Sequence, residues 1–172
     1  MRQGVVLLAM VLSSSTLCAC ANKSRAETTS AASGLTANAT VDYVVDGDTV
    51  DLIIDGVEER VRLIGIDTPE TKKENTPIEC FGLEATAFAQ SLLPEGTQLY
   101  VERDVEARDV YGRLLAYIYR IDNGIFVNLE IVRQGYAQPL TIPPNVAHST
   151  EFVEAARAAE RANLGLWAEC SG

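Results

Sequence analysis

Residues 41–66, VDYVVDGDTVDLIIDGVEERVRLIGI, decide the fold of this chain. They contain three segments rich in β-branched and other large apolar residues, at 41–45, 49–54 and 58–66. Asp55-Gly56 lies between the second and third segments and is a strong signal for a tight hairpin turn. The stretch therefore predicts three consecutive strands.

Two further strands and several helices are predicted after this unit. Strands are expected at 97–103 and 113–121, helices at 81–93, 126–134 and 152–162, and a proline-containing loop at 138–147. Ser149 or Thr150 is the expected N-cap of the last helix. This order of elements predicts an α+β fold that is mainly β. We expect a five-stranded OB-type Greek-key barrel with about three helices packed against it.

Length and composition limit the possible classes of protein. A chain of 172 residues, 47% of them hydrophobic, can fill one well-packed core and is too short for two ordinary domains. The net charge of −10 argues against a general nucleic-acid-binding protein, which would carry a basic face. An enzyme whose carboxylates hold a divalent cation remains compatible with this charge, but its grip on an anionic substrate should be weak.

The N-terminal segment is predicted to direct export. Arg2 precedes the apolar run 5–12, which is too short to span a bilayer but is typical of an export signal over residues 1–20. Residues 21–40 contain almost no large apolar side chains, so we expect a flexible tether. The folded domain is then expected at residues 41–172.

The end of this signal allows two interpretations. Leu17-Cys18-Ala19-Cys20 is similar to the box that precedes a lipid-modified cysteine in bacterial lipoproteins, which predicts an acylated Cys20 and attachment to the cell envelope. Ala19-Cys20-Ala21 also matches the small-residue pattern of ordinary signal cleavage, which would release a secreted protein. The lipoprotein is the favoured interpretation.

Two cysteines, Cys80 and Cys170, lie in the predicted domain. Export would permit them to form a disulfide, and closing so long a loop stabilises by roughly 4 to 5 kcal/mol in the chain-entropy estimate. Cys80 as a nucleophile is the alternative. No histidine is near it in the sequence, since the single histidine is His148. The sequence therefore favours the disulfide.

Acidic residues are expected to meet at the open end of the first hairpin. With the turn at Asp55-Gly56, we predict that Asp48 lies opposite Gly65 and that Asp46 lies opposite Asp67. The carboxylate of Glu70 would follow just beyond this cluster.

Such a cluster needs a neutralising partner. Like charges opposed across strands are destabilising, and Ca²⁺ would neutralise them by binding carboxylates and a backbone carbonyl such as that of Thr68. The alternative is that Asp46-Gly47-Asp48 only makes a turn and Asp67-Thr68-Pro69 only ends a strand, because Asp, Gly and Pro dominate turns. The convergence of both segments favours the metal.

Two arginines lie near this predicted cluster. Arg62 is expected opposite Asp51, so an ordinary cross-strand ion pair is as good an interpretation of Arg62 as a functional role. Arg113 follows Tyr111-Gly112 at the start of a strand, where an isolated arginine would be solvated. The spacing of these residues leaves both alternatives open.

Three ordered blocks carry a resemblance to a known family: VDGDTV at 45–50, RLIGIDTPET at 62–71 and DVYGRLLAY at 109–117. Together with VRQG at 132–135 and the Leu166-Trp167 end, they resemble the signature of the staphylococcal nuclease (thermonuclease) family, in the same order and with similar gaps. The resemblance covers residues 41–169. It implies an OB-type barrel that hydrolyses DNA and RNA with Ca²⁺ and leaves 3′-phosphorylated products.

The resemblance also implies a set of metal ligands. Asp48 and Asp67 would bind Ca²⁺ directly, Thr68 would offer its carbonyl, and Asp46 would act through water. This set agrees with the preference of Ca²⁺ for oxygen ligands.

Catalytic roles follow from the resemblance in the same way. Arg62 and Arg113 take the positions of the phosphate-binding pair, where guanidinium groups would stabilise the charge that develops on the attacked phosphorus. Glu70 takes the position of the carboxylate that activates water, although it could instead orient the water or the loop. Tyr111 would contact the substrate, and Asp109 would shape the loop before Arg113.

The chain departs from the family pattern at the substrate-binding positions. Val110 stands where a lysine is known, and Leu140 and Ile142 lie near the positions of two tyrosines. An aromatic platform for a base is therefore lost there, although Tyr111 remains and Tyr136 is expected nearby. We expect weak substrate binding, a high KM and strong sensitivity to salt.

Two other functions compete with hydrolysis. The same barrel could hold an oligonucleotide or an oligosaccharide without cutting it, as OB folds often do. A lipoprotein with a purely structural calcium site is a third interpretation. We expect a monomer in each case.

Overall fold

The computed structural model describes residue 1 and residues 34–71 and 77–170. The predicted export signal, the lipidation site Cys20 and most of the predicted tether lie outside these residues. The folded unit begins earlier than the predicted start at residue 41. Asn38 already exchanges hydrogen bonds with the backbone of Val101, at 2.7 and 3.1 Å, and the first strand starts at Ala39.

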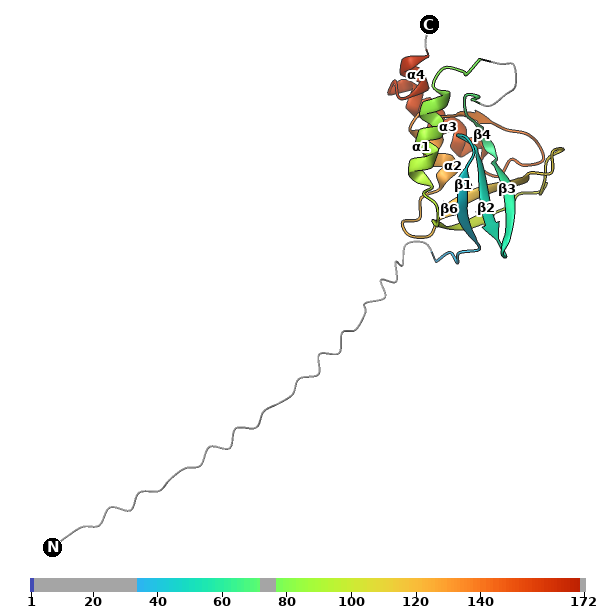
Figure 1. Ribbon diagram of the computed structural model, residues 1–172. Coiled ribbons are helices and arrows are strands. Elements are labelled where there is room, and N and C mark those ends of the chain that lie inside the picture. Colours follow the sequence, from blue (N-terminus) through green and yellow to red (C-terminus); the bar gives the residue numbers. More distant parts are fainter. Residues whose placement is uncertain (2–33, 72–76, 171–172) are drawn as a thin grey trace.

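Five strands close into a barrel (Figure 1). They are β1 (Ala39–Val44), β2 (Thr49–Ile54), β3 (Val57–Leu63), β5 (Gln98–Glu102) and β6 (Leu114–Arg120). Around the barrel their order is β1-β2-β3-β6-β5, and β1 closes it by pairing with β5. The β3–β6 pair is parallel and the others are antiparallel. The predicted five-stranded OB-type barrel is confirmed.

The core fills the barrel and the space under the helices. Alternate residues of each strand point inward, as period-two alternation requires. Among the most buried are Val50, Leu52, Val61, Leu63, Leu99 and Ile118. Tyr117 and Phe152 are the largest fully buried side chains, and they extend the core toward the helices.

The hairpin turn is at the predicted residues, but the predicted register is wrong. Asp55 and Gly56 have φ angles of 52° and 79° and form a two-residue turn, so Ile54 pairs directly with Val57. In this register Arg62 lies opposite Thr49, whereas Asp51 lies opposite Arg60. The error is a shift of two residues, so each side chain keeps its predicted face of the hairpin.

The predicted third strand breaks before its end. Gly65 has a φ of 82°, and its missing side chain makes room for the Phe152 ring. The chain then continues as β4 (Gly65–Asp67), which pairs with β7 (Gln138–Leu140) in a separate two-stranded sheet. Part of the region predicted as a loop at 138–147 is therefore a strand, and the backbone of Asp67 pairs with Gln138 and not with the first hairpin.

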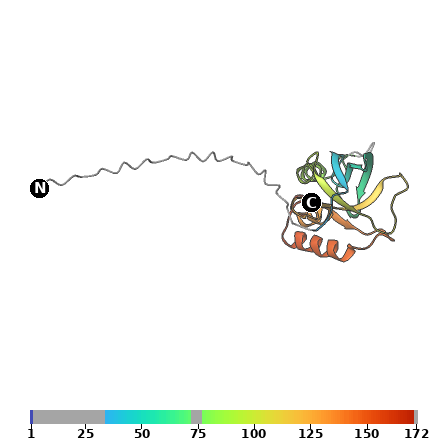
Figure 2. The ribbon, with the colours of Figure 1, turned by 90° about the horizontal axis from the view of Figure 1, so that it is seen from below.

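Four helices complete the described chain: α1 (Gly82–Leu92), α2 (Val127–Arg133), α3 (Ser149–Arg161) and the short α4 (Leu166–Glu169). They lie on one side of the barrel, with α3 outermost (Figure 2). The predicted N-cap of α3 is wrong, because His148 occupies that position and makes no side-chain capping bond. In the part of the chain that the structure describes, no helix has the length and apolar character needed to cross a membrane.

A disulfide joins Cys80 to Cys170, as the sequence predicted. It links the residues before α1 to the residue that follows α4, across a separation of 90 residues. Gly165 has a positive φ, and its backbone lies directly against the backbone of Gly135, which follows α2. This turn allows α4 to bring Cys170 to Cys80.

Candidate functional site

Two of the predicted acidic residues, Asp48 and Asp67, are joined through Arg62 at one end of the barrel, and Asp46 lies beside Asp48. Asp48 lies in the loop between β1 and β2, and its Oδ2 accepts hydrogen bonds from the backbone N–H and the hydroxyl of Thr68, both at 2.9 Å. A Cβ on Gly47 would lie 2.7 Å from the Thr68 hydroxyl, so only glycine allows this approach without a shift. The structure therefore brings Asp48, Asp67 and Thr68 together, although the predicted pairing of the hairpin does not hold.

Two carboxyl groups in this cluster have raised pKa values. Burial raises the pKa of Asp46, and the negative charge of Asp48 adds to the increase. Burial also raises the pKa of Asp67; the positive charge of Arg62 opposes this effect, while Glu79 and Glu70 add to it. The Asp46 carboxylate is held by a hydrogen bond from the Asp48 N–H at 3.1 Å. Burial, with a smaller contribution from neighbouring carboxylates, thus disfavours the ionised forms of both groups.

Arg62 lies between the two acidic segments. Its Nη2 donates to Asp67 Oδ1 at 2.9 Å and lies 3.2 Å from Asp48 Oδ2. Its Nη1 donates to the carbonyls of Leu63 and Ile66, at 2.6 and 3.0 Å. With a side chain only 14% exposed, Arg62 is built into this end of the barrel. The predicted cross-strand pair with Asp51 is wrong.

Asp51 instead pairs with the residue that lies opposite it. Both of its carboxylate oxygens accept hydrogen bonds from Arg60, at 2.8 and 2.9 Å. The ordinary ion pair that competed with a functional role for Arg62 therefore involves another arginine, which leaves Arg62 for the acidic cluster.

Arg113 is held by a single loop. Its Nε donates to Asp109 Oδ2 at 2.7 Å, and its guanidinium carbon lies 5.6 Å from the centre of the Tyr111 ring. Asp109 Oδ1 accepts the backbone N–H groups of Tyr111 and Arg113. Burial alone would raise the pKa of Asp109, but these bonds and the arginine charge lower it overall. Asp109 thus shapes the loop in the way the sequence suggested.

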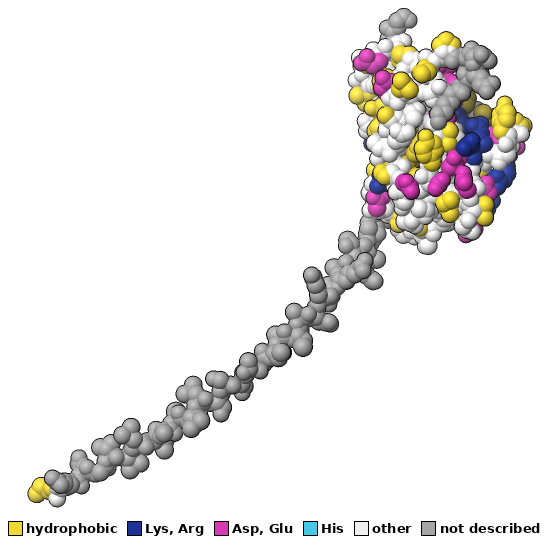
Figure 3. All heavy atoms as spheres, viewed as in Figure 1, with side chains coloured by type: hydrophobic (Ala, Val, Ile, Leu, Met, Phe, Trp, Pro, Cys, Tyr) yellow, Lys and Arg dark blue, Asp and Glu magenta, His cyan; other side chains and the backbone are white. Residues whose placement is uncertain are grey.

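A cleft of about 410 Å³ runs between the two arginines. Its apolar lining includes Val110, Tyr111, Leu140 and Ile142. Val110 and Tyr111 are 93% and 82% exposed at its rim. On the face shown in Figure 3, basic side chains gather at one place directly beside acidic ones. Arg62 and Arg113 thus share one cleft with the residues that depart from the family pattern.

Tyr136 does not belong to this cleft. Its ring stacks on those of Phe88 and Phe81, with centroid distances of 4.1 and 5.2 Å. It therefore fixes α1 against the end of α2, and the expectation that Tyr136 lies near the substrate site is wrong.

Two buried asparagines, which the sequence did not single out, support the site. Asn145 exchanges hydrogen bonds with the backbone of Glu106, at 2.8 and 3.0 Å, and so joins the two walls of the cleft. Asn128 receives the N–H of Ile118 and donates to the carbonyls of Ile64 and Ala116. It thereby satisfies the backbone where β3 gives way to β4. An asparagine inside an apolar helical segment was the available signal for Asn128.

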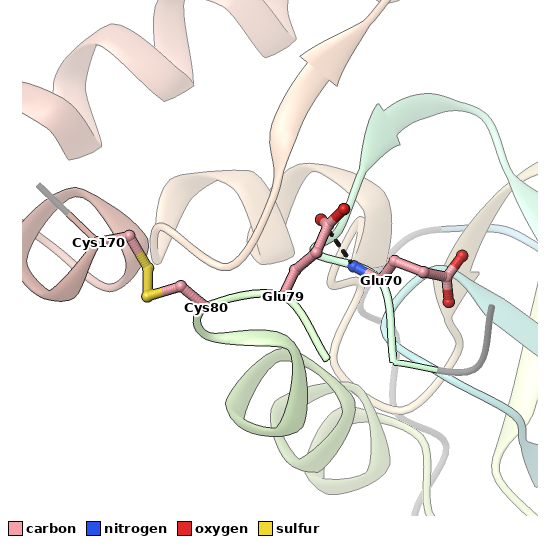
Figure 4. Close-up of a disulfide and its surroundings, with 4 residues drawn as sticks. All are labelled: Glu70, Glu79, Cys80 and Cys170. Atoms are coloured by element: carbon pink, nitrogen blue, oxygen red, sulfur yellow. Dashed lines mark hydrogen bonds between the residues drawn. A yellow bond between two sulfur atoms is a disulfide. The ribbon is translucent and has the colours of Figure 1, made fainter. Parts of the chain in front are cut away.

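Glu70 follows β4 in the loop before α1 and does not line the cleft. Its Oε1 accepts the N–H of Thr71 at 2.8 Å, and its own N–H donates to Glu79 Oε2 at 3.1 Å. Figure 4 shows the Glu70 carboxylate extending away from Glu79 and from the disulfide. Its negative charge nevertheless reaches Asp67, whose pKa it raises.

The chemistry of the cluster suits a hard cation. Its donors are all oxygens, and the Asp48 and Asp67 carboxylates already meet at one guanidinium nitrogen. Among the described residues no three acidic, histidine or cysteine side chains converge in an arrangement that could hold a metal. A cation here would need two carboxylates, the Thr68 carbonyl and water, which is a set that Ca²⁺ accepts.

The chain is similar to one protein family and to several nucleases. Residues 60–169 match the protein family described as "Staphylococcal nuclease homologue". The chain is 39% identical over 127 residues to a thermonuclease of Staphylococcus intermedius, covering 74% of each chain. It is 34% identical to a thermonuclease of Staphylococcus hyicus, covering 72% of each. It is also 35% identical to the endonuclease YncB of Bacillus subtilis, covering 77% of this chain and 62% of that protein.

Proposed function

Because this chain belongs to the staphylococcal nuclease family, we propose that it is a calcium-dependent nuclease that hydrolyses DNA, RNA or both to 3′-phosphorylated products. One observation carries the proposal. Arg62 and Arg113, from segments far apart in the sequence, line the same cleft, and Arg62 also contacts the Asp48 and Asp67 carboxylates. A phosphodiester lying in this cleft would face two guanidinium groups beside an acidic cluster.

The metal ligands are part of this proposal. Asp48, Asp67 and the carbonyl of Thr68 would hold Ca²⁺, and Asp46 would act through water. When bound, the ion supplies positive charge that stabilises the charge developing on the phosphate. The raised pKa values of Asp46 and Asp67 are consistent with the proposal. Burial raises both pKa values, and neighbouring carboxylates add to the increase, so a bound cation would favour the ionised forms.

The two arginines would each bind oxygen atoms of the same phosphate group. Guanidinium groups donate two parallel hydrogen bonds to phosphate oxygens, and this geometry fits the growing charge of the transition state better than an ammonium group does. Glu70 would accept a proton from the attacking water, or orient that water, at its carboxylate. Tyr111 would contact the nucleotide at the rim of the cleft.

Substrate binding is expected to be weak. The base would meet the aliphatic side chains of Val110, Leu140 and Ile142, which line the cleft but offer no ring on which a base could stack. The chain also carries a net charge of −10, which repels a polyanion at long range. A high KM that rises steeply with salt follows from both features.

We also propose that the protein works outside the cytoplasm. The N-terminal pattern described above supports export, with a lipid anchor at Cys20 as the favoured form and a secreted protein as the alternative. Metabolic labelling with a radioactive fatty acid would separate them, because Cys20→Ala should abolish labelling of a lipoprotein and change nothing in a secreted protein.

The activity is tested by incubating denatured DNA with the protein in the presence of Ca²⁺ or a chelator. We expect fragmentation that requires Ca²⁺ and is lost in Arg62→Ala and Arg113→Ala. Arg157→Ala, which removes an exposed arginine on α3, is the matched control and should cut normally. Binding without fragmentation would instead favour an oligonucleotide- or oligosaccharide-binding module.

A further inference from the structure

The disulfide lies at one end of a continuous set of contacts that leads to Glu70 (Figure 4). Cys80 is fixed to Cys170 beyond α4, and its neighbour in the sequence is Glu79. Glu79 does not line the cleft, and its influence on the acidic cluster described so far is its charge, which adds to the raised pKa of Asp67. Its contacts lead from the disulfide to Glu70, and their functional meaning rests on the proposed function of Glu70.

Glu79 holds the backbone of Glu70 from both sides. Its side-chain Oε2 accepts the N–H of Glu70 at 3.1 Å, and its own N–H donates to the Glu70 carbonyl at 2.9 Å. Both polar groups of the Glu70 backbone are therefore engaged by one residue. The Glu70 side chain is fixed locally, because its Oε1 accepts the Thr71 N–H at 2.8 Å. Fixing this backbone thus fixes the direction of the carboxylate.

The start of α1 supports the same contact. Gly82 donates its N–H to the Glu79 carbonyl at 3.1 Å. A Cβ on Gly82 would lie 2.7 Å from the Thr71 methyl group and 3.2 Å from the Glu70 carbonyl, so the helix start packs directly on the segment that carries Glu70.

Two attachments hold the start of α1 in place. Phe81 adopts a left-handed conformation with φ of 69°, which a bulky side chain keeps only when its surroundings enforce it. The disulfide at Cys80 lies on one side, and the stack of Phe81 on Tyr136 lies on the other.

We propose that Glu79 and the Cys80–Cys170 disulfide form a brace that positions Glu70 for the reaction. In this brace, Glu79 is a positioning residue that touches neither metal nor substrate. The disulfide fixes Glu79 by tying the start of α1 to the C-terminal end of the described chain. Loss of either part should let the Glu70 carboxylate leave its working position, while Arg62, Arg113 and the cleft remain unchanged.

The kinetic test compares Glu79→Ala with Glu79→Gln in the full chain, using Ca²⁺ and denatured DNA. Glu79→Ala removes the acceptor for the Glu70 N–H and should lower kcat about tenfold or more, with KM changed less than about twofold. Glu79→Gln keeps an acceptor oxygen without the charge and should stay within about threefold of the wild-type kcat. If Gln loses as much activity as Ala, the charge of Glu79 matters and the brace is overturned.

The disulfide is tested with Cys80→Ala/Cys170→Ala. This variant should lose kcat to about the same extent as Glu79→Ala, and adding Glu79→Ala to it should cost little more, because both changes release the same contact. Ile118→Val, a buried change in β6, is the control for lost stability. Assayed below its melting temperature, it should keep its kcat. Independent, multiplying losses from Glu79 and the cysteines would contradict a single brace.

Amide hydrogen exchange separates failure of the brace from failure of the proposed nuclease. The Glu70 N–H should exchange at least about tenfold faster in Glu79→Ala and in the cysteine variant than in the wild type, with or without any catalysis. If the wild type does not cut DNA, the proposed function fails and exchange still decides the brace. Unchanged exchange at Glu70 in both variants would overturn the brace even in an active nuclease.

Discussion

The two arginines of the cleft differ in how the chain holds them. Arg62 uses both Nη groups for contacts within its own end of the barrel, to two backbone carbonyls and the Asp67 carboxylate, and it also lies beside Asp48. Arg113 uses its Nε for one carboxylate in its own loop, Asp109. In the described part of the chain its Nη groups have no hydrogen-bond partner. The guanidinium group of Arg62 is thus held by contacts within the fold, whereas the Nη groups of Arg113 remain available in the cleft.

This difference separates two ways of binding a phosphate. Arg113 is oriented before any ligand arrives, because Asp109 also holds the backbone of the loop that carries it. Arg62 compensates the acidic cluster, so a cation bound by Asp48 and Asp67 would take over that compensation and leave Arg62 for the substrate. Arg62 is expected to matter for folding and catalysis together, and Arg113 for catalysis alone.

The largest effect is expected for Arg62→Ala. Loss of one guanidinium should lower kcat/KM about a thousandfold. Without Ca²⁺ the variant should also lose about 3 kcal/mol of unfolding free energy, because Asp48 would stay buried beside Asp67 without a counterion. Ca²⁺ should restore much of that stability but none of the activity. Denaturant unfolding with and without Ca²⁺ measures this, and equal destabilisation in both conditions would contradict the role assigned to Arg62.

Arg113→Ala should show the contrasting pattern. We expect kcat/KM to fall about a hundredfold, while the unfolding free energy changes by less than about 1 kcal/mol, because the Arg113–Asp109 pair is partly exposed. Steady-state kinetics and denaturant unfolding on the same preparation test both statements. A destabilisation as large as that of Arg62→Ala would remove the distinction between the two arginines.

A smaller effect is expected for Gly47→Ala on the Arg62 side. The new methyl group would lie 2.7 Å from the Thr68 hydroxyl, so Thr68 must move and its bonds to Asp48 must lengthen. We expect a loss of about 1–3 kcal/mol in stability and weaker Ca²⁺ binding by calorimetry. Gly56→Ala, at the open hairpin tip, is the control that should lose stability through its φ of 79° without losing Ca²⁺ affinity.

The smallest effect is a difference in pH dependence, measured without Ca²⁺. The raised pKa of Asp46 means that its ionised form opposes folding, so Asp46→Asn should be more stable than wild type at neutral pH. That gain should shrink as the pH falls below the raised pKa and vanish near the ordinary aspartate pKa, where the unfolded chain is protonated as well.

The lowered pKa of Asp109 has the opposite sign. Its ionised form stabilises the fold above the ordinary aspartate pKa, and this contribution is lost as the pH falls through the lowered value. Asp109→Asn should therefore be less stable than wild type at neutral pH and should approach it in acid. Unfolding curves from pH 7 to about pH 3 test both variants. If both variants were more stable than wild type at neutral pH, or both less stable, the opposite signs predicted here would be wrong.

The sequence predicts the barrel well because its signals are local. Apolar alternation marks each strand, and Asp55-Gly56 marks the hairpin turn at the residues where the structure has it. In a two-residue turn at Asp55-Gly56, the flanking residues Ile54 and Val57 pair with each other. The predicted register was displaced by two positions from this pairing and was therefore wrong. The partner of Arg62 therefore could not be predicted from that register.

The remaining misses depend on contacts between distant segments. The residues next to Gly65 in the sequence do not show whether this glycine continues the strand or takes a positive φ. The Phe152 ring and the pairing of β4 with β7 determine its conformation. The buried asparagines Asn128 and Asn145 act on backbone groups that become their partners only after the barrel closes. The family blocks could be located in the sequence, whereas the residues that hold the blocks together could not.

The parallel pairing of β3 with β6 has a consequence for when the protein can act. Arg62 lies in β3 and Arg113 directly precedes β6, and these two strands become neighbours only when the long stretch between them has folded back. Pairing across so many residues is slow compared with hairpin formation. If the proposed export passes the chain through a membrane unfolded, its two guanidiniums stay apart during passage. The nuclease site would then form only after the barrel closes, outside the cytoplasm of the cell that makes the protein.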